Sequence, residues 1–347
     1  MIERLTHTPL APYTTLGVGG PADTLIITET YDETLQVLQS TENPIWFLGY
    51  GSNCLISDKG LSGTTILWRG GSISHTDTEL TVDAGVLWDD LVKAAIEHGL
   101  WGFELMSEIP STVGGAIFGN IAAYGQQVSD TLVWVEVYDT DTKEIYTLQQ
   151  DEITFAYRQS SLQSEPQRKI LRARFKLATT PLHTLKYDSA IAIADELGLD
   201  PENLEQCRKI IIETRTHAGS IYHYDDPNAE RTAGSFFKNP LVSIEQAKML
   251  ASFDETGKTL DRIVNQSKIH GGNAQRASAA HVLLAAGFHR GQSWGNVRLH
   301  PNHVLKIETL PGATAQDVYD VTQLILDAVK DKLDISLEPE VKFLGEF

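Results

Sequence analysis

The first half of the chain contains two glycine-rich segments, Gly49-Tyr-Gly-Ser-Asn53 and Ile109-Pro-Ser-Thr-Val-Gly-Gly-Ala-Ile-Phe-Gly-Asn120, and the second is followed by Ala123-Tyr-Gly125. Glycine lets a backbone approach a ligand and point successive N–H groups at one anion, as binding of a pyrophosphate requires. Neither segment matches GxGxxG at a strand-to-helix turn or GxxxxGKS/T, so a Rossmann or P-loop fold has no support. Taken singly, each segment is more typical of a tight turn than of a nucleotide site.

Short apolar runs surround these segments and predict a mixed fold. An apolar stripe at Leu87, Leu91 and Ala95 predicts an amphipathic helix over 87–98, which Gly99 ends. The first half of the chain is therefore expected to be α+β, because β-rich runs occupy 45–48, 64–68, 80–83, 132–139, 144–148 and 169–177.

Beyond residue 187 the apolar period becomes mainly helical. The stretch 216–231 has no steady period and many turn-forming residues, so it is predicted to be a surface loop. Strands are predicted over 304–308 and 338–344, and helices over 188–197, 202–213, 243–251, 276–286 and 315–332.

The composition excludes several classes of protein. The chain has 46 acidic and 28 basic side chains and a formal charge of −18, which argues against nucleic acid as a partner. Cys54 and Cys207 belong to no CxxC or Cys/His cluster, so we expect buried thiols and no metal site. No apolar run approaches the ~20 residues that span a bilayer, and the N-terminus lacks a leader pattern. We therefore expect a cytoplasmic protein without membrane contact.

The order of motifs along the chain resembles the UDP-N-acetylenolpyruvoylglucosamine reductase family. Its flavin-binding half is matched by 15–22, 49–53, 84–85 with Trp88, and 109–125. Three further segments match elements specific to the reductases, Phe155-Ala-Tyr-Arg-Gln-Ser160, Ala233-Gly-Ser-Phe-Phe-Lys-Asn-Pro240 and Leu337-Glu-Pro-Glu-Val-Lys-Phe-Leu-Gly345. The resemblance covers essentially the whole chain.

The resemblance implies an α+β fold with an FAD-binding domain of the vanillyl-alcohol-oxidase type, followed by a smaller α+β substrate-binding domain. The FAD-binding domain is expected over 1–180, with subdomains of about 1–70 and 71–180. A helical bridge over 181–214 would lead to the C-terminal domain, 215–347, whose last strand returns to the active site. The implied protein is a monomer that uses FAD and NADPH to reduce UDP-N-acetylglucosamine enolpyruvate to UDP-N-acetylmuramate, a peptidoglycan precursor.

Arg158, Ser235 and Glu340 match the catalytic positions of the family. The resemblance implies two half-reactions, in which NADPH reduces FAD and the reduced flavin then adds hydride to C3 of the enolpyruvyl group. The planar cationic fork of Arg158 suits the negative charge that spreads from C2 into the carboxylate, and Glu340 is placed beside that group. Ser235 is assigned the proton that C2 takes, because a positioned hydroxyl can protonate a strongly basic carbanion.

The resemblance also assigns contacts to the two ligands. Substrate contacts are Tyr157, Lys238, Asn239 at the diphosphate, and Tyr187 on a loop that closes over the UDP moiety; phenol and amide donors suit phosphate oxygens. The assigned flavin contacts are Gly49, Tyr50, Gly51, Ser52, Asn53, Ile109, Pro110, Ser111, Thr112, Gly114, Gly115, Asn120, Ala123, Tyr124, Gly125 and Arg215.

Three positions depart from the family pattern. Ala218 and Gln163 stand where lysine is usual, and Ser111 stands where glycine is usual. Loss of two cations is expected to weaken binding of the anionic substrate by more than about tenfold, unless Lys186, Lys238 or His217 compensates. Ser111 would be strained if its backbone needed a positive φ.

Two other functions stay open. One is a different FAD-dependent oxidoreductase of the same fold, such as an oxidase; these often hold flavin covalently through histidine, and the glycine segments contain none. The other is a non-catalytic binder of UDP-sugars, which would have no chemical use for Arg158, Ser235 and Glu340 together.

Overall fold

The computed structural model describes residues 2–222, 226, 229–253 and 274–347. Contacts divide the chain into two compact units, each assembled from separate segments. Unit 1 consists of Met1–Pro9, Pro21–Ser52 and Leu61–Ala229, and unit 2 of Leu10–Gly20, Asn53–Gly60 and Glu230–Phe347. The first glycine segment therefore changes unit between Ser52 and Asn53. The domain boundaries expected near residues 180 and 215 stay a prediction.

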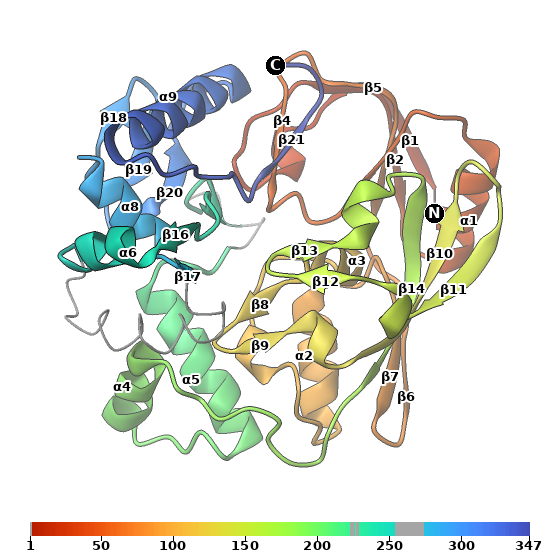
Figure 1. Ribbon diagram of the computed structural model, residues 1–347. Helices are drawn as coiled ribbons and strands as arrows, with labels where there is room; N and C mark the ends of the chain where they lie inside the picture. The colour runs from red at the N-terminus through yellow and green to blue at the C-terminus, as the bar shows by residue number, and fades with distance from the viewer. Residues whose placement is uncertain (1, 223–225, 227–228, 254–273) are drawn as a thin grey trace. The chain divides into compact units, whose positions relative to one another are not determined.

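Unit 1 contains a four-stranded sheet in the order β1-β2-β5-β3. Strands β1, β2 and β5 of this sheet are labelled in Figure 1. Strand β1 (Glu3–Pro9) runs antiparallel to β2 (Pro21–Thr28), whereas β2 and β3 (Ile45–Leu48) both run parallel to β5 (Leu61–Trp68). Helix α1 (Tyr31–Ser40) connects β2 to β3 and begins where Thr30 Oγ1 accepts a hydrogen bond from Glu33 N.

A second sheet of unit 1 has the order β11-β10-β14-β7-β6, and all neighbouring strands are antiparallel (Figure 1). Its core includes Trp88, Phe103 and Phe175, whose rings meet edge to face with centroids 5.0 to 6.2 Å apart. Trp88 begins helix α2 (Trp88–Glu97), and a second short helix is α3 (Val113–Gly119). The strands are β6 (Ile73–Thr76), β7 (Glu79–Asp83), β10 (Leu132–Asp139), β11 (Ile145–Gln149) and β14 (Arg168–Lys176).

Two helices complete unit 1. Helix α4 (Asp188–Leu197) ends at Gly198, whose φ is +63°, and α5 (Leu204–His217) begins where Asn203 accepts a hydrogen bond from Gln206 N. Buried side chains of both helices, including Ile210, pack with the region around Trp101 and Leu105. Helix α5 is therefore packed against the part of unit 1 that precedes the second glycine segment.

Unit 2 contains an antiparallel sheet in the order β15-β20-β19-β18. Val282, Leu299, Ile307 and Ile325 are fully buried in its core. Two other strand pairs belong to this unit, β16 (Leu241–Ser243) with β17 (Ala274–Arg276), and β4 (Cys54–Ile56) with the parallel β21 (Lys342–Leu344). The remaining elements are β15 (Thr232–Ser235), β18 (Ser293–Trp294), β19 (Val297–His300), β20 (His303–Thr309), α6 (Ile244–Ala251), α8 (Ala279–Ala285) and α9 (Ala315–Leu333).

Most predicted elements are confirmed closely, but four bounds are wrong. Strand β5 begins at Leu61 and not at residue 64, and helix α5 ends at His217 and not at residue 213. The helix expected over 276–286 begins only at Ala279, because Arg276 pairs with Leu241 in the β16–β17 ladder. The strand expected over 338–344 begins at Lys342, because Pro339 forms a bridge with Phe237 instead. The sequence prediction also lacked β1, β2 and α1.

Two further predictions concern loops and cysteines. The loop predicted over 216–231 is wrong at its first two residues, because Thr216 and His217 belong to α5. The described residues from 218 to 231 form no helix or strand, and residues 223–225 and 227–228 lie outside the described residues. Cys54 and Cys207 are buried and unbridged, which confirms the prediction of buried thiols.

Candidate active site

The two glycine segments of unit 1 lie against each other. A Cβ added at Gly49 would lie 2.9 Å from Thr112 Oγ1 and 3.8 Å from Gly115 Cα. Arg69 Nη1 donates a hydrogen bond of 2.8 Å to the carbonyl of Gly49, and its guanidinium lies 5.8 Å from the ring centre of Tyr50. The close approach therefore depends on the missing side chain at Gly49.

The second segment is a helix start and not the tight turn that its glycines suggest. Thr112 Oγ1 accepts a hydrogen bond from Gly115 N at 3.2 Å, which caps α3. The N–H groups of Val113 and Gly114 donate to the carbonyls of Val86 and Ala84, both at 2.9 Å. The N–H groups of Val113, Gly114 and Gly115 at the start of α3 are therefore used within the protein.

The first segment has the opposite character. Gly51 has a φ of +72°, which glycine adopts without strain. Within the part of the chain that the structure describes, neither Gly51 nor Ser52 uses its backbone N–H in a hydrogen bond. Adjacent N–H groups beside a positive φ form an anion-binding concavity. Gly51 and Ser52 therefore fit the diphosphate of a dinucleotide.

Arg215 lies in the last turn of α5 and is a second group that is suited to bind an anion. Its Nη2 donates to the carbonyls of Glu108 at 3.1 Å and Ser220 at 2.7 Å, whereas its buried Nε has no hydrogen-bond partner. Burial lowers the pKa of Arg215, and among the described residues no carboxylate forms an ion pair with it. A buried guanidinium donor of this kind is stabilised by an anionic ligand.

Ser111 is not strained by its departure from glycine. Its φ is not positive, whereas that of the neighbouring Glu108 is +58°. The Ser111 hydroxyl donates to the carbonyl of Thr112 at 2.9 Å. The replacement of the usual glycine by Ser111 therefore causes no backbone strain.

Arg158 lies in the two-residue turn between β12 (Phe155–Ala156) and β13 (Gln159–Ser160). Its φ is +56°, at a turn position where glycine or asparagine is favoured. Its Nη1 donates a hydrogen bond of 2.9 Å to the carbonyl of Ala122. Backbone strain of this kind costs about 1–3 kcal/mol and is characteristic of functional sites.

Gln163 supports the same turn. Its Nε2 donates to the carbonyl of Phe118 at 2.8 Å and to the carbonyl of Arg158 at 3.3 Å. The sequence alone identified Gln163 only as a missing lysine. The structure gives its amide a positioning role at the Arg158 turn.

Tyr124 lies at the tip of a second hairpin, between β8 (Ala122–Ala123) and β9 (Gln126–Gln127). Tyr124 and Gly125 have φ values of +49° and +95°, the combination found in type I′ turns. The Tyr124 ring meets the ring of Tyr187 edge to face at 5.3 Å, and Tyr187 is 52% exposed. The structure thus brings the predicted lid tyrosine and a predicted flavin contact together within unit 1.

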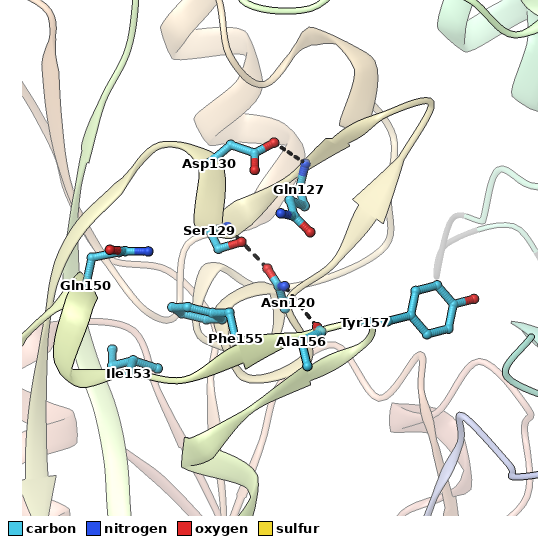
Figure 2. Close-up of a pocket in the computed structure, with 9 residues that line it drawn as sticks. All are labelled: Asn120, Gln127, Ser129, Asp130, Gln150, Ile153, Phe155, Ala156 and Tyr157. Carbon is cyan, nitrogen blue, oxygen red and sulfur yellow. Dashed lines mark hydrogen bonds between the residues drawn. The ribbon is translucent and has the colours of Figure 1, made fainter. Parts of the chain in front are cut away.

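A pocket of about 540 Å³ adjoins the Tyr157–Arg158 turn (Figure 2). Asn120 links two of its walls, because its Oδ1 accepts from Ser129 N and its Nδ2 donates to the carbonyl of Ala156, both at 3.2 Å. Figure 2 shows the Tyr157 ring pointing away from the other side chains that line the pocket. Asn120, predicted as a flavin contact, therefore has a structural role between these segments.

Unit 2 contains Ser235 and Glu340 on paired segments. Ser235 is exposed at the end of β15, directly after Gly234 with a φ of +73°. Glu340 N donates to the carbonyl of Phe236 at 2.8 Å, and Asn53 Nδ2 donates to the carbonyl of Glu340 at 3.3 Å. Asn53, the last residue of the first glycine segment, thus helps to hold the Glu340 segment.

The predicted substrate contacts of unit 2 follow Ser235 directly. Lys238 Nζ lies 3.3 Å from Glu338 Oε2, so its charge is already balanced by a carboxylate. Asn239 Oδ1 accepts from Ala279 N at 2.9 Å and caps α8, while its Nδ2 has no partner among the described residues. Asn239 Nδ2 and the remaining N–H groups of Lys238 Nζ are therefore both donors that could reach a phosphate oxygen.

The predicted residues form one group in each unit. Arg158, Tyr124 and Arg215 belong to unit 1, whereas Ser235, Glu340, Asn53, Lys238 and Asn239 belong to unit 2. In the described part of the chain, no cluster of three or more histidine, cysteine, aspartate or glutamate side chains could hold a metal ion. Sequence reasoning missed Arg69, which supports Gly49, because Arg69 lies outside the motifs that the sequence offered.

Two protein-family models match the chain. Residues 226–344 match the model described as UDP-N-acetylenolpyruvoylglucosamine reductase, C-terminal domain, and residues 27–148 match the model of an FAD binding domain. These matches confirm the predicted FAD-binding α+β half and the reductase-type C-terminal half.

Full-length relatives agree with the family models. The UDP-N-acetylenolpyruvoylglucosamine reductase of Streptomyces avermitilis is 31% identical over 99% of this chain and 96% of its own length. The reductase of Cutibacterium acnes is 32% identical over 97% of this chain and 89% of its own. The crystal structure of the reductase from Thermus caldophilus aligns over 99% of both chains, with 26% identity and a TM-score of 0.65. The chain therefore belongs to the UDP-N-acetylenolpyruvoylglucosamine reductase family.

Proposed function

We propose that the chain reduces UDP-N-acetylglucosamine enolpyruvate to UDP-N-acetylmuramate for peptidoglycan synthesis, with FAD as bound cofactor and NADPH as reductant. The observation that carries this proposal is the near full-length relationship to reductases of that name. We further propose that the chain is a cytoplasmic monomer. Among the described residues, no helix has the length and apolar character needed to cross a membrane.

FAD, when bound, supplies the hydride for C3 of the enolpyruvyl group and is restored by NADPH. The N–H groups of Gly51 and Ser52 and the buried Nε of Arg215 would hold the diphosphate of FAD. Tyr124 lies close enough to Arg215 for the guanidinium to oppose the rise in the Tyr124 pKa that burial causes. The other glycine-segment residues shape the backbone around the cofactor.

Arg158 stabilises the charge that develops during hydride addition. Its guanidinium is fixed by the carbonyl of Ala122 and by the strained turn, so little reorganisation is needed when the carboxylate becomes more negative. Glu340 lies beside the enolpyruvyl group in this proposal. Its backbone is held by hydrogen bonds with the carbonyl of Phe236 and with Asn53 Nδ2.

Ser235 donates the proton that C2 takes after hydride addition. Ser235 is exposed and directly follows Gly234, whose positive φ changes the direction of the backbone at the end of β15. Asn239 Nδ2 and the phenol of Tyr187 bind the UDP moiety, with Tyr157 beside Arg158.

The test is an anaerobic titration of the purified yellow protein. NADPH is expected to bleach the flavin, and UDP-N-acetylglucosamine enolpyruvate is expected to restore its absorbance. Recovery with oxygen or another acceptor, but not with the enolpyruvate, would favour an oxidase of the same fold. Tight enolpyruvate binding without turnover would favour a non-catalytic binder, and a chain that cannot take up FAD would contradict the proposal.

Ser235→Ala separates the two half-reactions. Bleaching by NADPH is expected to stay near the wild-type rate, while reoxidation by the enolpyruvate slows by at least about a hundredfold, as loss of a positioned proton donor requires. Equal slowing of both steps would reject the proton-donor role of Ser235.

A further inference from the structure

A buried carboxylate lies behind the hairpin that carries Tyr124. Glu104 is 1% exposed, and its two oxygens accept hydrogen bonds from Gly102 N at 2.7 Å and from Gln126 Nε2 at 2.6 Å. Gln126 is equally buried, and its Oε1 accepts from Leu105 N at 3.0 Å. No cation of the described residues pairs with Glu104. Neutral donors alone therefore hold a charge that proteins rarely bury without an ion-pair partner.

The directions of these hydrogen bonds require a carboxylate at position 104 and an amide at position 126. Both oxygens of Glu104 act as acceptors, and the N–H of Leu105 fixes which end of the Gln126 amide faces Glu104. An amide at position 104 could offer only one acceptor, so its NH2 group would face either Gly102 N–H or the Gln126 NH2. The negative charge of Glu104 also acts on Cys207, whose pKa is raised to about 12 by burial and secondarily by this carboxylate.

The pair determines the position of the β8–β9 hairpin. Gln126 begins β9 and is the register partner of Ala123 across the Tyr124-Gly125 turn. The preceding residue, Ala122, accepts the hydrogen bond from Arg158 Nη1 at 2.9 Å. One hairpin therefore sets both the ring of Tyr124 and the guanidinium of Arg158.

We propose that Glu104 is a positioning residue of the reductase, which fixes the β8–β9 hairpin through Gln126 and thereby holds Arg158 and Tyr124 in their working positions. The inference rests on the proposed function, because Arg158 is assigned to the enolpyruvate half-reaction. A positioning role predicts an effect on that step beyond any loss of stability.

Glu104→Gln tests the role with almost no change in volume. Reoxidation of the reduced flavin by the enolpyruvate is expected to slow at least about tenfold, because displacement of a charge-stabilising group by a fraction of an ångström has effects of that size. Bleaching by NADPH is expected to change much less. In the flavin-free chain, amide hydrogen exchange of the β8–β9 hairpin is expected to accelerate, which provides a readout independent of activity.

The exchanged pair, Glu104→Gln with Gln126→Glu, is the decisive variant. The amide at 104 can donate to the carboxylate at 126 and accept from Gly102 N, while the new carboxylate accepts from Leu105 N. All three hydrogen bonds and the buried charge are retained, and only the hydrogen bond between residues 104 and 126 reverses its direction. Reoxidation and hairpin protection are both expected to return to within about threefold of wild type, a coupling that a double-mutant cycle measures.

Val135→Ala is the matched control for stability. Val135 is fully buried in β10, and its truncation leaves a cavity that lowers the melting temperature without touching the hairpin. Its reoxidation rate and hairpin exchange should equal those of wild type below the melting temperature. If Glu104→Gln does not fold, Gln126→Asn, which shortens the same arm by one methylene, replaces it.

Two outcomes would overturn the inference. One is a folded Glu104→Gln variant with wild-type reoxidation and wild-type hairpin exchange. The other is an exchanged pair that regains hairpin protection but not the reoxidation rate. If the wild-type flavin is not reoxidised by the enolpyruvate at all, the proposed function fails, and the exchange measurements still decide whether Glu104 fixes the hairpin.

Discussion

The two glycine segments have similar composition and opposite roles. At 49–52, Gly51 has a positive φ and the N–H groups of Gly51 and Ser52 donate to no described residue. At 112–115, the N–H groups of Val113, Gly114 and Gly115 all donate within unit 1, and the chain continues as a helix. We therefore propose that Gly51 of the first segment serves a ligand, whereas Gly114 and Gly115 of the second serve close packing.

If the two segments differ in this way, substitutions in them should change two different quantities, the free energy of unfolding and the dissociation constant for flavin. Changes in the packing segment are expected to alter the free energy of unfolding and to leave flavin affinity per folded molecule unchanged. Changes in the open segment are expected to alter the dissociation constant for flavin. Each substitution below adds or replaces about one methyl group, so differences in outcome reflect location.

Gly85→Ala should have the largest effect, and on stability. The Ala84-Gly85 backbone anchors the start of α3, and a Cβ at Gly85 would lie 2.3 Å from Cγ of the buried Trp68. Displacing that ring is expected to cost about 3 kcal/mol, measured by urea unfolding of the flavin-free chain. Gly99→Ala is the control, since its Cβ meets nothing within 4 Å and only the strain of its φ of +68° remains, about 1 kcal/mol. Equal losses in the two variants would contradict the packing role.

Gly51→Ala should have the next largest effect, and on flavin binding. An alanine relaxes the loop away from positive φ, so binding must restore that conformation at a cost of about 1–2 kcal/mol. The flavin dissociation constant, followed by fluorescence quenching on reconstitution, is expected to rise about tenfold. Unfolding of the flavin-free chain should change little. A loss confined to stability, with wild-type flavin affinity, would remove the contrast between the segments.

Thr112→Val tests the helix cap. The substitution keeps the shape of the side chain and removes the acceptor for Gly115 N, which is expected to cost about 1 kcal/mol of stability. Urea unfolding of Thr112→Val and of Thr112→Ser, which keeps the hydroxyl, gives the comparison. The flavin dissociation constant should stay within about threefold of wild type, because the N–H groups proposed to bind the diphosphate, those of Gly51 and Ser52, lie outside α3.

Periodicity predicted α2, α4 and β10 closely, because in each an apolar stripe of regular spacing packs against the core. It could not predict α3, which contains Gly114, Gly115 and Gly119 in seven residues and has a low intrinsic helix propensity. Carbonyls of Val86 and Ala84, far away in the sequence, hold that helix in place. Tertiary contacts thus override local preference at the site.

The site could be predicted in part. Resemblance supplied the positions of Arg158, Ser235 and Glu340, whose catalytic roles stay a prediction. It could not supply their supports, because those depend on residues distant in sequence. The sequence marked Gln163 only as a position where the usual lysine is missing. In the structure its amide donates hydrogen bonds to the carbonyl of Phe118 in α3 and to the carbonyl of Arg158.

Gly115→Ala should have the smallest effect and is the most direct challenge to the comparison. Alanine is favoured over glycine inside a helix by about 0.8–1.0 kcal/mol, but the new Cβ would lie 3.0 Å from Ser111 Oγ, which must shift slightly. The two terms nearly cancel, so stability in urea is expected to stay within about 0.5 kcal/mol of wild type. The informative measurement is the flavin dissociation constant beside that of Gly51→Ala. If the methyl group at 115 weakens flavin binding as much as the one at 51, the α3 glycines also approach the ligand, and both segments serve the cofactor directly.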